Sequence, residues 1–185
     1  MNTITMVAIA VAVLAIVFGI FMYVQKQRTG RLRSKYGPEY ERLVDRYGDQ
    51  RKAEEDLAHR ERRVQKLHIR DLDRREADHF ARAWQEQQAR FVDSPNEAVV
   101  NADQLVGELM ATLGYPMGDF EQRAADVSVD HPSVVANYRA AHSLAGRSGR
   151  GEADTEDLRQ AMIHYRALFE DLLKRDVSHS EEVKR

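Results

Sequence analysis

Apolar side chains are unevenly distributed along this chain of 185 residues. Residues 4–24, ITMVAIAVAVLAIVFGIFMYV, contain no charged side chain, whereas the chain after Val24 is strongly polar. A helix of these 21 residues, at about 1.5 Å per residue, spans about 31 Å and matches the roughly 30 Å hydrocarbon core of a bilayer. Within the hydrocarbon core, a single segment can satisfy its own backbone hydrogen bonds only as a helix. The pattern therefore predicts a transmembrane anchor over residues 1–25.

The apolar segment lacks the features of a cleaved signal peptide. Its flank MNTITM has no Lys or Arg, and it ends in FMYVQKQR, which is a poor cleavage site. We therefore expect the anchor to be retained.

Residues 36–72 are predicted to form a long charged helical stalk, with Pro38 in its first turn. Apolar positions recur every seven residues, but polar ones interrupt them, which makes a poor coiled coil. Gly48 costs about 1 kcal/mol in a helix interior. Two interpretations are open: a stalk that pairs weakly or lies against the domain, and a solvated helix with local pairs such as Asp56 with Arg60. The apolar positions are Tyr36, Tyr40, Leu43, Tyr47, Leu57 and Val64.

Residues 73–174 are predicted to form a bundle of about five amphipathic helices. Apolar residues recur there at helical spacing, no segment alternates with a period of two, and the fold class is therefore all-α. About 100 residues are enough for one small core. The tail, residues 175–185, has nothing to bury and is expected to be disordered. The apolar stripes fall within 77–91, 98–113, 120–127, 134–145 and 158–172.

Capping residues mark the expected helix ends. Asp73 with Glu76 and Ser94 with Glu97 are spaced as capping boxes, and Gly114 ends the second bundle helix. The third helix is expected to run from Asp119 to about Val127, and Asp130 and Thr155 are expected to cap the last two. GRSGRG at 146–151 is interpreted as an interhelical loop.

Charge is segregated, although the formal net charge is only −2. Five basic residues follow the apolar segment, and the positive-inside rule places them in the cytoplasm, with the N-terminus outside. They are expected to contact lipid head groups at about 1 kcal/mol per charge. The chain from Tyr36 onward holds 23 basic and 30 acidic side chains, which argues against nucleic-acid binding. The basic collar is Lys26, Arg28, Arg31, Arg33 and Lys35.

Small residues line one side of the predicted anchor. Ala8, Ala12, Ala15 and Gly19 follow a 4-3-4 spacing and so share a helix face. Such faces let two helices approach closely, which makes a homo-oligomer one possible assembly. The alternative is that alanine is simply frequent in membrane anchors.

Histidines and tyrosines gather in the last two predicted helices. His131, Tyr138, His142 and His164 are the candidates for a catalytic or ligand cluster, since imidazole is both a general base and the commonest metal ligand. Their spacing matches no metal-binding motif, however, and Tyr and His on an apolar stripe commonly pack their rings and bond their tips to a neighbouring helix. We therefore assign no catalytic, cofactor-binding or metal-ligating residue.

The absence of cysteine excludes disulfides, thiolate catalysis and Cys-based metal sites. No cofactor is expected.

Two long sequence segments resemble a family of uncharacterised bacterial membrane proteins with a single N-terminal span and a helical C-terminal region. The segments are GYPMGDFEQRAADVSVDHPSVVANYRAAH at 114–142 and GEADTEDLRQAMIHYRALFEDLL at 151–173. The likeness covers nearly the whole chain. It implies this architecture and a location in the bacterial inner membrane, and it transfers no site residues.

Three functions are open at this point. The first is a cytoplasm-facing interaction or scaffold module that recruits a protein partner to the lipid bilayer. The second is an enzyme or small-ligand binder that uses the His/Tyr cluster. The third is a self-assembling structural membrane protein. With no catalytic motif in the chain, we favour the first.

Overall fold

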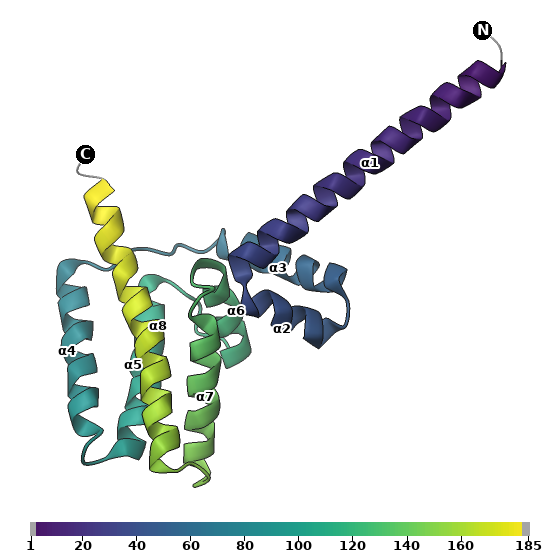
Figure 1. Cartoon of the computed structure of the whole chain (residues 1–185). Coiled ribbons are helices and arrows are strands. Elements are labelled where there is room, and N and C mark those ends of the chain that lie inside the picture. The colour runs from purple at the N-terminus through teal and green to yellow at the C-terminus, as the bar shows by residue number, and fades with distance from the viewer. Residues whose placement is uncertain (1–2, 183–185) are drawn as a thin grey trace. The chain divides into compact units, whose positions relative to one another are not determined.

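The protein is entirely helical over the residues that the structure describes. The computed structural model describes the backbone of residues 3–182 and the side chains of residues 12–20 and 22–174. Eight α-helices, α1 to α8, account for the regular structure of that backbone (Figure 1). The prediction of an all-α fold is confirmed.

The chain divides into two compact units, Met1–Glu54 and Glu55–Arg185. The first contains α1 (Thr3–Tyr36), α2 (Pro38–Tyr47) and the start of α3 (Gln50–Val64). The second contains the rest of α3 together with α4 (Arg74–Arg90), α5 (Pro95–Leu113), α6 (Phe120–Asp130), α7 (Val135–Gly149) and α8 (Thr155–Glu182). The five helices expected between 73 and 174 are thus present as α4 to α8.

The predicted stalk is not one long helix. Two glycines with positive φ interrupt it, Gly37 at +47° and Gly48 at +61°. Pro38 follows the first break and starts α2, because proline suits a first helical position. Gly48 ends α2 in the left-handed conformation, with its N–H bonded to the carbonyl of Val44. The prediction of a continuous stalk helix over 36–72 was wrong for this reason.

The start of α3 is fixed to α1 by side-chain hydrogen bonds within the first unit. Asp49 caps α3 by accepting from the N–H of Arg51 at 2.8 Å. Thr29 of α1 donates its hydroxyl to Glu54 of α3 at 2.7 Å. Gln50 donates to the Thr29 hydroxyl at 3.0 Å. These bonds place the first turn of α3 against α1.

No helix is long and apolar enough to cross a membrane among the side chains at 12–20 and 22–174. Residues 4–11 and Phe21 of the predicted span lie outside those described side chains. The transmembrane prediction is therefore not supported by the described part of α1.

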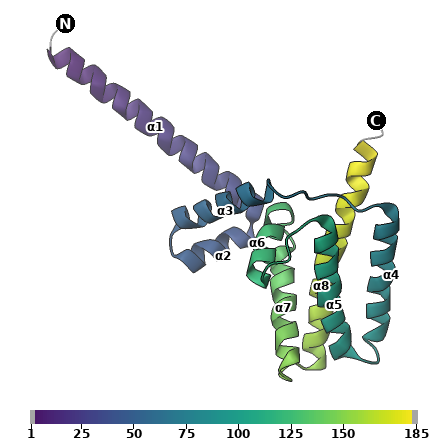
Figure 2. The same cartoon turned by 180° about the vertical axis from the view of Figure 1, so that it is seen from behind.

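Four long helices and one short helix form the bundle of the second unit, in addition to residues 55–64 of α3. Figures 1 and 2 show α4, α5, α7 and α8 lying side by side, with α6 near the start of α7. Their apolar stripes meet in one core, in which Tyr165, Leu168 and Val106 are fully buried. The indole of Trp84 on α4 stacks on Phe169 of α8, with ring centroids 4.8 Å apart. Burying each such side chain contributes about 1.5–3 kcal/mol.

Residues 55–64 of α3 belong to this second unit and bond to α6. Arg63 donates through Nε to Asp126 at 2.7 Å, and Arg60 donates to the Ser128 hydroxyl at 3.2 Å. The side chain of Asp126 is only 1% exposed. The expected pair of Asp56 with Arg60 is present at 2.6 Å.

Several predicted helix ends are confirmed. Asp73 and Glu76 form a complete capping box at the start of α4. Asp119 was expected to be the first residue of its helix; it lies one residue before α6 and caps it by accepting from the N–H of Gln122. Gly114 ends α5 with φ at +97°. The α5 box is only partly as predicted, because Ser94 holds the N-cap position but its side chain makes no capping hydrogen bond.

Two other predicted helix starts were wrong, by one residue at α8 and by about a turn at α7. Asp130 is the last residue of α6 instead of the cap of α7, which starts at Val135. Pro132 explains this. The residue before a proline is disfavoured in the helical region, so His131 is the C-cap of α6 and the helix stops at Asp130. Thr155 is the first residue of α8, and Asp154 caps it by accepting from the N–H of Asp157 at 2.8 Å.

Two segments expected to be irregular are helical. A loop was expected over 146–151, but α7 continues to Gly149 and the loop starts only after it. Leu144 and Ala145 still pack on the core, and α7 continues past them for this reason. α8 continues to Glu182, where a disordered tail over 175–185 was expected. No Gly or Pro follows Gly151, so nothing in that stretch breaks the helix. The side chains of the tail and residues 183–185 lie outside the described residues.

Candidate functional site

The four predicted cluster residues do not converge on one point. Tyr138 and His142 share a face of α7, His164 lies on α8, and His131 is at the end of α6. Each makes a different contact between helices, so the cluster separates into three local arrangements.

His131 connects α6 to α8. Its Nδ1 lies 2.7 Å from an oxygen of Asp171, and because a carboxylate only accepts, this nitrogen carries the proton. The residue is 5% exposed. Its Nε2 is buried and makes no hydrogen bond with the described part of the chain. The side chain therefore fixes the α6–α7 junction against α8.

Tyr138 and His142 pack around Phe120 of α6. The imidazole of His142 stacks on the Phe120 ring with centroids 3.7 Å apart, and the Tyr138 ring lies 4.9 Å from it. Arg123 donates through Nε to the Tyr138 hydroxyl at 3.2 Å. Burial raises the pKa of Tyr138, and the nearby charge of Arg123 only partly offsets this effect. These contacts attach α6 to α7.

His142 also belongs to a polar network that the sequence analysis missed. Tyr165 of α8 donates its hydroxyl to Oδ1 of Asp103 on α5 at 2.8 Å. Nδ1 of His142 lies 3.7 Å from the same oxygen, which is too long for a hydrogen bond, so the two form an ion pair only when the imidazole is protonated. Asp103 sits four residues after Val99 and three before Val106, which are both fully buried. That spacing is the sequence signal that could have identified it.

The pKa values of Asp103 and Tyr165 are shifted in opposite directions in this network. Burial acts to raise the pKa of Asp103, but the adjacent His142, the Tyr165 hydrogen bond and the charge of Arg123 outweigh it and hold that pKa below the ordinary value. Burial, followed by the charge of Asp103, raises the pKa of Tyr165 far above its usual range. Asp103 is therefore ionised and Tyr165 neutral near pH 7.

His164 stands apart from this network. Its Nδ1 lies 2.9 Å from the amide oxygen of Asn137, which is on α7. The three candidate imidazoles of His131, His142 and His164 do not meet at one point, and no group of three His, Asp or Glu side chains that could hold a metal is found among the described residues.

The GRSGRG arginines are already paired with carboxylates. Arg147 lies 2.9 Å from Asp157, and Arg150 lies 2.9 Å from Glu152. The segment therefore offers little uncompensated positive charge to an anion.

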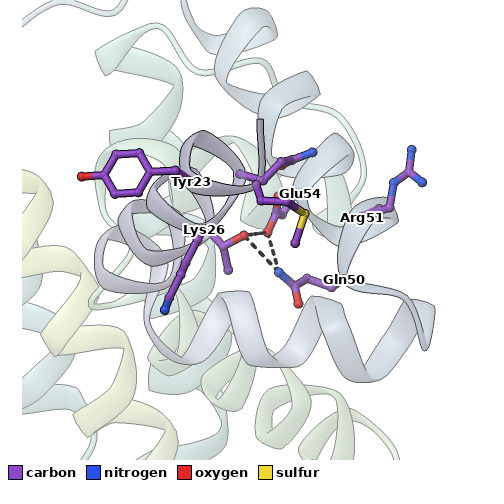
Figure 3. Close-up of a pocket in the computed structure, with 8 residues that line it drawn as sticks. Tyr23, Lys26, Gln50, Arg51 and Glu54 are labelled. Atoms are coloured by element: carbon purple, nitrogen blue, oxygen red, sulfur yellow. Dashed lines mark hydrogen bonds between the residues drawn. The ribbon is translucent and has the colours of Figure 1, made fainter. Parts of the chain in front are cut away.

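A groove of about 720 Å³ lies between α1 and the start of α3, within the first unit (Figure 3). Met22, Lys26 and Thr29 of α1 line it together with Gln50, Arg51 and Glu54 of α3. Its volume is within the roughly 300–1,000 Å³ of ordinary ligand sites.

Glu54 is the centre of the hydrogen bonding in this groove. It accepts from Thr29 at 2.7 Å, from Gln50 at 3.0 Å and from the Tyr40 hydroxyl at 3.2 Å. The residue is 6% exposed. Burial acts to raise the pKa of Glu54, but these donors and the charge of Arg28 lower it overall. Its negative charge is thus stabilised from within the protein.

The predicted basic collar divides into two sets. Arg33 pairs with Glu41 at 2.6 Å, and the ammonium of Lys35 lies 4.9 Å from the centre of the Tyr36 ring. Lys26, Arg28 and Arg31 form no ion pair with the described residues, and Lys26 lines the groove. Arg51 joins Lys26 there, although it is 25 positions further along the chain and was not predicted.

The predicted small-residue face is exposed where the structure describes it. Ala12, Ala15 and Gly19 are exposed, and a Cβ added at Gly19 would meet nothing within 4 Å. Ala8 lies outside the described side chains.

Comparison with models of known protein families, with curated proteins and with solved structures finds no match to this chain.

Proposed function

We propose that this protein is a membrane-anchored interaction module, with a retained N-terminal anchor and a cytoplasm-facing helical domain that recruits a protein partner. In this proposal the anchor lies in a bacterial inner membrane with the N-terminus outside. Residues 4–24 supply an uncharged run, and the basic collar that follows gives the orientation.

One observation carries the proposal. Every side chain described at 12–20 and 22–24 is exposed, including Leu14 at 68% and Phe18 at 65%. These twelve side chains are spread over more than three turns of helix, so apolar groups are uncovered around the whole circumference of this part of α1. A partner helix would cover one face, whereas a bilayer covers all of them.

The bundle contacts favour an interaction domain over an enzyme. The polar ends of the cluster residues bond to neighbouring helices, as in His131 with Asp171 and Tyr138 with Arg123. These side chains act as connections between helices in our proposal, which leaves the acidic outer surface to meet the partner.

Cysteine accessibility tests the anchor and its orientation, because the chain has no native cysteine. Asn2→Cys places one thiol before the proposed anchor, and Asp93→Cys places one thiol after it. In spheroplasts, a membrane-impermeant maleimide should label the first variant, and it should label the second only after lysis. Equal labelling of both before lysis, or recovery of the chain in the soluble fraction, would contradict the proposed anchoring.

The partner is tested separately. Detergent-solubilised membranes from cells that express the tagged chain should yield a co-purifying protein. A variant of the same chain with several acidic surface residues neutralised should lose that protein. Repeated recovery of the chain alone would reject the interaction role while leaving the anchor untouched.

Self-association of the anchor is a second candidate, favoured by the exposed face of Ala12, Ala15 and Gly19. Gly19→Leu with Ala15→Leu should abolish association in an in-membrane dimerisation assay. Val17→Leu lies on another face and is the matched control. Unchanged association of the double variant would reject this interface.

A further inference from the structure

We propose that the groove between α1 and α3 binds the primary ammonium of an ethanolamine phospholipid head group, with Glu54 as the carboxylate that accepts it. This inference rests on the proposed membrane anchor. It goes beyond that anchor because it assigns a ligand to one buried side chain that lies outside both the apolar run and the basic collar.

Glu54 is an anion without an ion-pair partner among the residues that the structure describes. The residue is 6% exposed, and its donors Thr29, Gln50 and Tyr40 are all neutral groups. Arg28 helps to lower the pKa of Glu54, after these hydrogen bonds, but the two form no ion pair. Buried charges in proteins are ordinarily paired, so this carboxylate points to a cationic ligand.

One oxygen of the Glu54 carboxylate is left open. All three donors bond to Oε1. Oε2 accepts no hydrogen bond from the described residues, and it is not sealed from solvent. Because Glu54 lines the groove, a ligand there can reach Oε2. A carboxylate only accepts hydrogen bonds, so the ligand that this oxygen favours carries a positively charged donor.

The two basic side chains that line the groove do not take this place. Figure 3 shows Lys26 and Arg51 extending away from Glu54 on opposite sides. Neither forms an ion pair with the described residues. The middle of the groove is therefore left to the anion, and a purely anionic ligand would be repelled there. The cationic flanks are compatible with a phosphate that follows the ammonium in the same head group.

The place of the groove along α1 favours a lipid over a soluble amine. Met22 and Tyr23 line the groove and belong to the apolar run that ends at Val24. Thr29, which bonds to Glu54, follows Met22 by about two turns of helix. An amphiphile matches both parts, with methylenes against Met22 and its ammonium at Glu54. In the proposed membrane this stretch of α1 lies at the cytoplasmic interface, where lipid head groups are found.

The open oxygen also selects among lipid head groups. A primary ammonium such as that of ethanolamine has three N–H donors. Choline carries the same charge, but three methyl groups replace its N–H donors and it forms no such bond with a carboxylate. Glycerol head groups carry no cation. A charged hydrogen bond is therefore available only to the ethanolamine head group among these three.

Native mass spectrometry of the full chain tests the proposal with a series of lipids. The protein is reconstituted in vesicles of phosphatidylethanolamine and phosphatidylcholine in equal amounts, extracted in a mild non-ionic detergent and examined for retained lipid. These two lipids share their phosphate and their net charge, so a difference in retention reports the ammonium alone. The unchanged chain should prefer phosphatidylethanolamine by about tenfold. Dimethylated phosphatidylethanolamine, which keeps one N–H, should be retained above phosphatidylcholine.

A matched pair of variants locates the site. Glu54→Gln preserves the length of the side chain and an acceptor oxygen for its three donors but removes the charge, so the preference should fall to about one. Glu55→Gln removes the same charge from the next residue, which is exposed and does not line the groove, and should keep the preference. Circular dichroism confirms that each variant is folded. The lipid series on the unchanged chain needs no variant, so it decides the matter even if Glu54→Gln does not fold.

The outcomes separate this proposal from the anchor on which it rests. Failure of the chain to enter vesicles would reject the anchor and the groove together. Entry with equal retention of phosphatidylethanolamine and phosphatidylcholine, or with an unchanged preference in Glu54→Gln, would overturn the groove alone.

Two further results would assign the groove to another cation and would also overturn the proposal. The first is equal retention of the two lipids together with thermal stabilisation of the detergent-solubilised chain by free ethanolamine, which indicates a soluble amine. The second is loss of a co-purifying protein from Glu54→Gln with the lipid ratio unchanged, which indicates a basic side chain of a partner.

Discussion

The hydroxyl of Tyr165 on α8 donates to Oδ1 of Asp103 on α5 at 2.8 Å, beside the apolar core of the bundle. Tyr165 is fully buried, and the side chain of Asp103 is 31% exposed. The bond therefore joins a core ring to a carboxylate at the core edge. Leucine and alanine stripes can be packed in more than one register, whereas this bond is made in only one.

Loss of the Tyr165 hydroxyl should weaken the bundle. Tyr165→Phe preserves the ring and removes the donor to Asp103, which we expect to lower the free energy of unfolding by about 1–2 kcal/mol. Denaturation of the detergent-solubilised chain, followed by the fluorescence of its single tryptophan, Trp84, measures the change. Tyr47→Phe removes a hydroxyl from a 40% exposed tyrosine and should change stability by less than about 0.5 kcal/mol. Equal effects of the two variants would contradict the prediction.

Asp103 should make stability depend on pH in the acid range. Its pKa in the folded chain is below the ordinary 3.8, so its ionised form stabilises the fold at every pH above that value. This contribution is lost as the pH falls from about 4 through the folded pKa. The stability difference between the unchanged chain and Asp103→Asn should thus be constant near neutrality and shrink in acid.

The neighbours of Asp103 set the control for that experiment. His142, Tyr165 and Arg123 face the carboxylate, and the contact with His142 is the largest of the effects that lower its pKa. Both chains are therefore compared by urea denaturation across the pH series, and the comparison is repeated in a His142→Gln background, where the difference should depend less on pH because the main cause that lowers the pKa of Asp103 is gone. A difference that grows as the pH falls would mean that the pKa of Asp103 is raised on folding.

Phe169 should be among the most costly core residues to truncate. It is 1% exposed and stacks on Trp84 at 4.8 Å, so Phe169→Ala leaves a cavity and removes a ring contact. We expect a loss of about 3–5 kcal/mol, together with a changed Trp84 emission in the folded state. Ile163→Ala, at a position on the same helix that is 46% exposed, should cost less than about 1 kcal/mol. Similar losses for the two would show that α8 does not bury the Phe169 face.

Three glycines should respond differently to alanine. At Gly114, where φ is +97°, an added Cβ would lie 2.4 Å from the backbone oxygen of His68, so strain of about 1–3 kcal/mol is joined by a steric overlap. At Gly48, where φ is +61° and nothing is within 4 Å, only the backbone strain of about 1–2 kcal/mol remains. Gly149 is helical with open space, and alanine there should stabilise by about 0.4–1 kcal/mol. Thermal unfolding ranks the three, and any other order would refute this account.

The bundle was largely predictable because the sequence signals that define its helices lie within a few residues of one another. The stripe from Leu158 to Leu172 repeats at the helical period, and its members are buried as expected. Asp73 with Glu76 and the helix-ending Gly114 could be recognised from a few neighbouring residues. Such signals require no knowledge of what lies elsewhere in the chain.

The stalk and the polar sites were predicted poorly because their determinants are distant in sequence. A break at Gly48 is favoured when Glu54 can reach Thr29, which lies 25 positions away. His131 and Asp171 are 40 positions apart, and Asp103 and Tyr165 are 62 apart. Periodicity identifies the residues on a buried face, but it does not say which polar side chains will meet across it.

Asp126 determines where the helical domain can be cut. Its buried carboxylate depends on the guanidinium of Arg63, which precedes the predicted domain start at Asp73. A fragment that begins at Asp73 would leave this anion with the neutral amide of Gln122, and stranding a buried charge costs about 3–5 kcal/mol. A fragment that begins at Glu55 carries its own counter-ion. The smallest portion suited to recombinant production therefore starts part-way along a helix and not in the loop that follows it.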